Sequence, residues 1–188
     1  MVVGQLPLRI DLGLLWTRQR DLPDAMKQAM GVLADRMTPY NLIEFKAPTD
    51  SLTDGDMSAF LGCACLFFSQ QREPIDHDDV SLFILAPAVT AGCRKELERL
   101  GLGLAQDEPG VCRVNDPLFR TWLVDLTVVG QHYPLLALFS PMILKDPEPI
   151  IKALIESGYG HLVYYVLQQI QQFQREGEQF AMQRRLRA

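Results

Sequence analysis

The sequence lacks long hydrophobic runs and has few cysteines. No apolar stretch among the 188 residues approaches the roughly 20 residues of a membrane-spanning helix. The N-terminus lacks the basic region and long apolar core of a secretory signal peptide. We therefore expect a cytoplasmic protein with no membrane partner.

The 4 cysteines do not have the C-x2-C spacing of a structural zinc site. Cys63 and Cys65 lie two positions apart in an expected helix, so they face away from each other and make a poor chelating pair. Free cysteine packs as a small hydrophobic residue. We expect the cysteines to be buried and reduced.

Basic residues are not in excess, because 18 lysines and arginines stand against 23 acidic residues, for a net charge of −5. This balance argues against a protein that coats nucleic acid non-specifically, since such binding depends on cations that neutralise phosphates. It does not exclude a nuclease, whose metal centre is itself acidic. The sequence also lacks a G-x-x-x-x-G-K-[ST] phosphate loop and a serine nucleophile elbow.

Apolar runs and amphipathic segments alternate along the first two thirds of the chain, which predicts an α/β fold with a mixed central sheet and flanking helices. Asn115-Asp116-Pro117 has turn chemistry and predicts a late β-hairpin. The expected strands are 8–16, 40–47, 80–86, 111–114, 120–129 and 134–139. The expected helices are 25–37, 56–71 and 90–100.

The pattern changes to helices alone after Asp146. Two are expected, over 147–157 and 160–185, joined at Gly158 and Gly160. We therefore divide the chain into an α/β core over residues 1–145 and a C-terminal helical appendage over residues 146–188.

The strand over residues 40–47 contains an acid and a lysine two positions apart, in the stretch Asn41-Leu42-Ile43-Glu44-Phe45-Lys46. Side chains at i and i+2 of a strand project to the same face. Glu44 and Lys46 therefore share a face with Leu42, while Ile43 and Phe45 pack on the other. Burying charge is costly unless it is paired or meets a ligand. The pair is thus either a structural ion pair or part of a metal-and-phosphate site.

Glu44-Phe45-Lys46, preceded by Asp11 on an earlier strand and followed by a helix, resembles the PD-(D/E)XK nuclease superfamily. More narrowly, three segments resemble uncharacterised bacterial transposase-like nuclease proteins. They are residues 6–11, 41–48 and 108–111. The resemblance implies a restriction-endonuclease-like core that hydrolyses phosphodiester bonds, with DNA as a partner.

By this resemblance, Asp11 and Glu44 bind Mg²⁺ or Mn²⁺, and the carbonyl oxygen of Phe45 is an extra ligand. Magnesium prefers a few carboxylate oxygens plus waters. Lys46 then orients or helps to deprotonate the attacking water and stabilises negative charge. Asp11 lies 44 − 11 = 33 positions before Glu44, a longer gap than the superfamily usually shows, so Asp35 is the second choice for its role.

Other interpretations stay open. Asp11 and Lys46 could form a structural ion pair without metal. The chain could also be an inactive nuclease-fold scaffold that mediates protein association, with a homo-oligomer formed through the apolar helix 56–71 or the C-terminal helix. Asp76-His77-Asp78-Asp79 is read as a solvated loop rather than a metal cluster.

Overall fold

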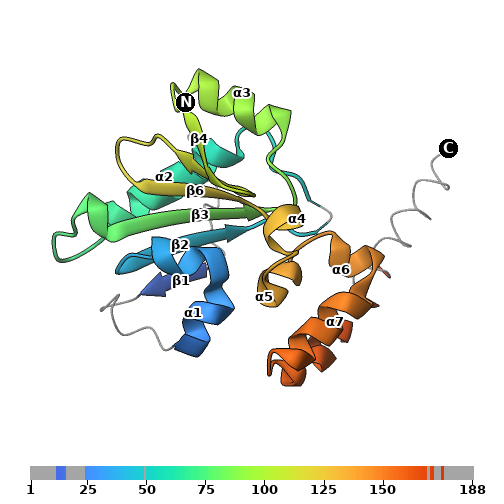
Figure 1. Ribbon diagram of the computed structural model, residues 1–188. Coiled ribbons are helices and arrows are strands. Elements are labelled where there is room, and N and C mark those ends of the chain that lie inside the picture. The colour runs from blue at the N-terminus through green and yellow to red at the C-terminus, as the bar shows by residue number, and fades with distance from the viewer. Residues whose placement is uncertain (1–11, 16–23, 49, 169, 172–174, 176–188) are drawn as a thin grey trace.

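The fold is built on one six-stranded mixed sheet with the strand order β1-β2-β3-β6-β5-β4 (Figure 1). The computed structural model describes residues 12–15, 24–48, 50–168, 170–171 and 175. The strands are β1 (Leu12–Leu15), β2 (Tyr40–Phe45), β3 (Val80–Ala86), β4 (Leu104–Glu108), β5 (Val111–Val114) and β6 (Arg120–Asp125).

The three central strands β2, β3 and β6 run parallel, so their carboxyl ends meet at one edge of the sheet. β1 pairs antiparallel with β2, and β4, β5 and β6 form an antiparallel unit on the other side. This arrangement confirms the predicted α/β class, with its mixed sheet and late hairpin. The predicted strand 80–86 matches β3 at both ends, because all seven of its residues are buried.

Helices cover both faces of the sheet, giving three layers (Figure 1). α2 (Asp56–Ser69) and α3 (Ala91–Arg99) pack on one face, around Met57, Phe60 and Leu97. The other face is covered around Leu33, Val129 and Leu136. The elements that supply this second cover are α1 (Asp24–Met30), the 3-10 helix η2 (Gly31–Arg36), α4 (Leu126–Val129) and α5 (Pro134–Ala137).

The single helix predicted over 25–37 is helical as far as Arg36 but divides at Gly31, and Met37 is extended. Gly31 has φ +54°, and a side chain there would collide with the ring of Tyr133. The left-handed backbone favours glycine and switches α1 into the tighter turns of η2. Ser81 on β3 fixes the end of η2, because its hydroxyl donates to the carbonyl oxygen of Arg36 at 2.9 Å.

Two predicted strands need correction. The strand predicted over 120–129 is wrong for its last four residues, and the strand predicted over 134–139 is wrong throughout. Residues 126–129 form α4, because the Asp125 carboxylate ends β6 and accepts the backbone N–H of Thr127 at 2.9 Å as a helix cap. Residues 134–139 are not a strand either, because Pro134 begins α5, where proline suits the first turn.

One strand was not predicted. β4 is polar and largely exposed, so it lacks the apolar alternation that marks a half-buried strand. Arg36 on η2 holds it against the sheet by hydrogen bonding Asp107 and pairing with Glu108 at 2.6 Å. The guanidinium carbon of Arg36 also lies 5.1 Å from the ring centre of Trp122 on β6.

The C-terminal helices form a third, smaller core of their own with α5. α6 (Met142–Lys145) and α7 (Pro147–Glu156) are followed by the 3-10 turn η4 (Gly160–Leu162) and by helical residues 163–168. Ile143, Leu154 and Val166 are buried together there. The predicted helix 147–157 is confirmed, and the one predicted over 160–185 begins as a 3-10 turn and lies partly outside the described residues.

In the part of the chain that the structure describes, no helix has the length and apolar character needed to cross a membrane. All four cysteines are free. Cys63 and Cys93 are buried, as predicted, and Cys112 is half-buried. The prediction is wrong for Cys65, which is exposed because it lies two positions from Cys63 on α2 and so faces away from the sheet.

Candidate functional site

The predicted alternation of side chains along β2 is confirmed. Leu42 packs in the core beneath α2, while Ile43 and Phe45 pack in the core on the other face. Asn41, the first residue of the motif, is fully buried. It fixes the entry to the strand by accepting the N–H of Thr38 at 2.9 Å and donating to the carbonyl oxygen of Thr38 at 2.6 Å.

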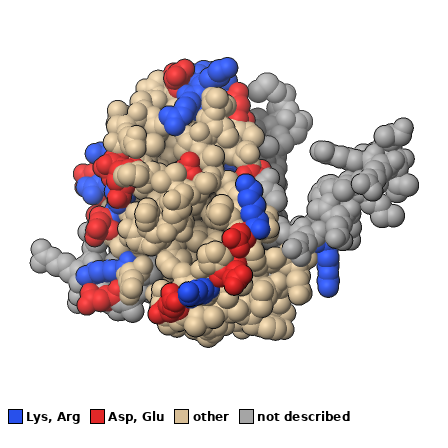
Figure 2. Space-filling model, turned by 45° about the vertical axis from the view of Figure 1, so that its right-hand side comes forward, with Lys and Arg blue, Asp and Glu red and all other residues tan. Residues whose placement is uncertain are grey.

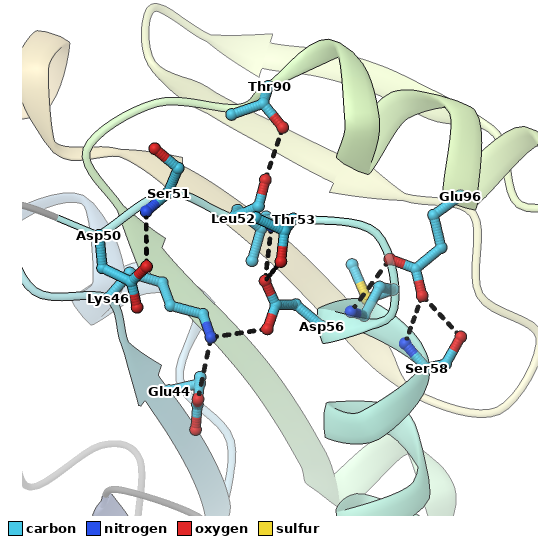
Figure 3. Close-up of polar contacts among 11 residues, drawn as sticks. Glu44, Lys46, Asp50, Ser51, Leu52, Thr53, Asp56, Ser58, Thr90 and Glu96 are labelled. Atoms are coloured by element: carbon cyan, nitrogen blue, oxygen red, sulfur yellow. Dashed lines mark hydrogen bonds and ion pairs between the residues drawn. The ribbon is translucent and has the colours of Figure 1, made fainter. Parts of the chain in front are cut away.

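Lys46 follows the last residue of β2 and turns its ammonium between two carboxylates (Figure 3). Its Nζ atom donates to Oδ1 of Asp56 at 2.8 Å and lies 3.7 Å from Oε1 of Glu44. The Lys46 side chain is 13% exposed, against 20% for Glu44 and 24% for Asp56. Its backbone N–H donates to Leu85 at 2.9 Å, so the ladder with β3 holds Lys46 in place.

The pKa values of the lysine and its main partner move in opposite directions. Burial lowers the pKa of Lys46, but the hydrogen bond to Asp56 and the charges of Asp56, Glu44 and Asp50 outweigh it and raise the pKa overall. Burial raises the pKa of Asp56, but hydrogen bonds from Lys46 and Thr53 outweigh it and lower the pKa overall. Both groups therefore remain charged at neutral pH.

Asp56 is positioned by the first turn of α2. Its Oδ2 atom accepts from the N–H of Thr53 at 2.5 Å and from the Thr53 hydroxyl at 2.8 Å, which ties the preceding loop to the helix. The other carboxylate oxygen is left to face Lys46 (Figure 3). Asp56 is the first residue of the helix predicted over 56–71, and no role in the site was predicted for it.

Glu96 on α3 holds the same helix start from the other side. It is fully buried, and its carboxylate accepts from the N–H of Met57 at 3.3 Å, the N–H of Ser58 at 2.9 Å and the Ser58 hydroxyl at 2.6 Å. A carboxylate at a helix N-terminus satisfies free N–H groups and suits the helix dipole. A lone acid within an amphipathic helix gives no sequence signal for this role.

Asp11, the predicted partner of Glu44, lies outside the described residues. β1 begins at the next residue, Leu12, which lies opposite Ile43 in the antiparallel pairing with β2. The second choice, Asp35, is exposed on η2, which precedes the amino end of β2 rather than the end that carries Lys46. Phe45 directs its side chain into the opposite core, where its ring is tilted against that of Phe139 with the ring centres 4.6 Å apart.

A further acid lies at the same edge of the sheet. Asp125 ends β6, where it is two strands from β2 in the parallel part of the sheet. Burial raises the pKa of Asp125, and hydrogen bonds from Thr127 and Val128 only partly oppose this. Its capping of α4 makes it a structural acid in this arrangement.

The solvated loop predicted over residues 76–79 is exposed at its first three residues, Asp76, His77 and Asp78. His77 stacks on Phe68 with ring centres 4.1 Å apart. Within the described ranges, no three His, Cys, Asp or Glu side chains are grouped so that they could hold a metal ion.

Burial raises the pKa of Cys93 to about 11, with the charge of Glu96 contributing, so this thiol is unreactive at neutral pH.

A scan against models of protein families, a search of curated proteins and a search of solved structures each found no match to this chain. The functional interpretation therefore depends on the geometry at the carboxyl end of β2.

Proposed function

We propose that this chain is a metal-dependent nuclease-like protein that hydrolyses phosphodiester bonds in nucleic acid. The observation that supports it best is the convergence of Glu44, Lys46 and Asp56 at the carboxyl end of β2. Ligand sites in open α/β sheets lie at such carboxyl ends. The order of an acid before a strand, an E-x-K strand beside it and a helix after the lysine agrees with the resemblance to the PD-(D/E)XK superfamily.

The chemistry of these residues fits a divalent cation. The ammonium of Lys46 lies within 4 Å of two carboxylates, so this point already holds one positive charge between acidic oxygens. Magnesium needs only one or two protein carboxylates, with water and phosphate oxygens completing its shell. Glu44 and Asp56 would hold the cation, and the resemblance adds Asp11 and the Phe45 carbonyl. A bound Mg²⁺ or Mn²⁺ would neutralise phosphate charge and lower the pKa of a bound water.

Lys46 is suited to donating hydrogen bonds rather than to removing a proton. Its raised pKa keeps it protonated at neutral pH, whereas a general base works best with a pKa near the operating pH. Of the two roles that the resemblance allows, we therefore assign it the stabilisation of negative charge on the phosphate.

The proposal is tested by cleavage of labelled DNA and RNA with Mg²⁺, with Mn²⁺ and with EDTA. We expect Glu44→Gln and Lys46→Met each to reduce the cleavage rate by about 100-fold or more, as loss of one charge-stabilising group does. Asp54→Asn is the control, because Asp54 is an exposed acid of the same loop that pairs with Arg99 instead. Equal rates for all variants, or cleavage that EDTA does not stop, would contradict the assignment.

The second candidate function is an inactive scaffold that mediates protein association. It is favoured by exposed apolar side chains on the C-terminal helices, among them Ile155, Tyr164 and Leu167. α2 offers less, because its apolar face already packs on the sheet. Light scattering of wild type and of Ile155→Ser with Leu167→Ser tests it: a monomer in both would leave this candidate without support.

A further inference from the structure

An apolar pocket of about 300 Å³ opens beside Lys46. One wall is the end of β2 and the loop after it, with Phe45, Lys46 and Pro48. The other wall comes from Phe139, in the turn between α5 and α6, and from the C-terminal helices, with Tyr165. The side of the molecule that carries α6 and α7 comes forward in Figure 2. Uncharged residues cover most of its centre there, and Lys and Arg side chains form no continuous band among the residues described.

The pocket presents aromatic faces rather than hydrogen-bonding groups. Phe45 and Phe139 line its wall, with their rings tilted at 36° and their centres 4.6 Å apart. Tyr165 also lines the cavity and is 63% exposed. A cavity of this size falls within the range of small-molecule sites, which are mostly apolar with few polar groups. The pocket suits a flat, aromatic group with its polar edges in water.

Among the described residues of the lining, Lys46 is the only charged one, and it is shared with the acidic cluster. Glu44, Asp50 and Asp56 surround its single positive charge, so the neighbourhood carries excess negative charge. A free fatty acid or other apolar carboxylate would be repelled there. A ligand with an aromatic group and a phosphate is compatible, because a cation held by the carboxylates would neutralise the phosphate.

We propose that this pocket binds the nucleobase of an unpaired nucleotide next to the scissile phosphate, an inference that rests on the proposed function. The substrate is then single-stranded or frayed nucleic acid, since a base inside a duplex cannot reach the pocket without leaving its stack. Aromatic faces stack on any base, so binding shows little sequence preference.

The test measures binding apart from cleavage. The protein is titrated into an oligonucleotide that carries 2-aminopurine, in a buffer that contains Ca²⁺ in place of Mg²⁺. The change in fluorescence gives the Kd of the protein for the oligonucleotide. We expect Tyr165→Ala to weaken binding by about 5- to 150-fold, as the loss of one base stack does, and Tyr165→Phe to restore it. Tyr164→Ala is a matched control, because Tyr164 is equally exposed at 65% but lies outside the lining.

The outcomes distinguish failure of the nucleobase pocket from failure of the proposed nuclease function. Cleavage by wild type with equal Kd values for Tyr165→Ala and Tyr164→Ala would overturn the pocket and leave the nuclease standing. Equal affinity for an abasic oligonucleotide would also overturn it, because the base would then contribute nothing to binding. Tyr165-dependent binding without any cleavage would support the pocket and count against the nuclease.

Discussion

Lys46 is held between Asp56 and Glu44 in a partly buried site, so removal of one acid leaves a cation with too few partners. We predict that Asp56→Asn lowers the free energy of unfolding by about 1.5–3 kcal/mol, the range for a lost hydrogen bond to a charged group. Urea denaturation at neutral pH measures it. Asp54→Asn, whose acid forms an exposed pair with Arg99, should change stability much less. Equal losses of unfolding free energy in the two variants would show that the Lys46–Asp56 pair stabilises the fold no more than the exposed pair does.

The same pair makes stability depend on pH in a defined direction. The folded-state pKa of Asp56 is lowered, so its contribution is present above the ordinary aspartate pKa of about 4 and is lost as pH falls through the lowered value. The pKa of Lys46 is raised, so its contribution is present below about 10.4 and is lost as pH rises through the raised value.

Wild type and Asp56→Asn should therefore differ most in stability between these limits. Urea melts across the acid range should show the two curves converging as pH falls below about 4. A difference that stayed constant into strong acid would mean that Asp56 is not the group responsible.

At the scale of residues, the sequence predicts what strand geometry determines locally. Glu44 and Lys46 share a face because strand side chains alternate, and Phe45 packs opposite for the same reason. Asp56 is ten residues further along, and its contact with Lys46 depends on the path of the intervening loop. No local sequence pattern predicts the path of this loop, so Asp56 was not predicted as the strongest partner of Lys46.

At the scale of elements, the first turn of α2 depends on α3. We predict that Glu96→Ala lowers the free energy of unfolding by about 1–3 kcal/mol, because the buried N–H of Met57 and the partly buried N–H of Ser58 lose their acceptor. Glu96→Gln keeps one acceptor oxygen and should recover part of the loss. Hydrogen exchange should also quicken at the start of α2 in Glu96→Ala. Protection that did not change would show that water replaces the carboxylate without cost.

The ends of an element could be predicted where the whole element is buried. They could not be predicted where a capping hydrogen bond determines whether the chain forms strand or helix. β3 is buried along its whole length, so its apolar run marks both ends. The apolar run that continues past Asp125 into α4 gives no such mark, because the change from strand to helix comes from one carboxylate bonding Thr127 and Val128. α5 is similar, since its short apolar stretch has no period that separates strand from helix.

At the scale of the whole molecule, the predicted division into an α/β core and a helical appendage can be tested by truncation. Ending the chain after Asp146 removes the partners of Ala137 and Ile143 in the third core, while the two cores on the sheet retain their buried residues. We expect cooperative unfolding to persist, with a loss of about 2–4 kcal/mol from exposed apolar side chains and increased binding of a hydrophobic dye. A truncated chain that is wholly unfolded would show that the two parts fold as one unit.

The outer strand β4 has a consequence for how copies of this chain could meet. An exposed strand edge is a template on which another chain can add a strand. The register of β4 shifts between Gln106 and Glu108, and its two acids are engaged by Arg36, so the row of free backbone groups is broken and charged. Strand addition at this edge is disfavoured, and a continuous sheet spanning two copies through β4 is not expected.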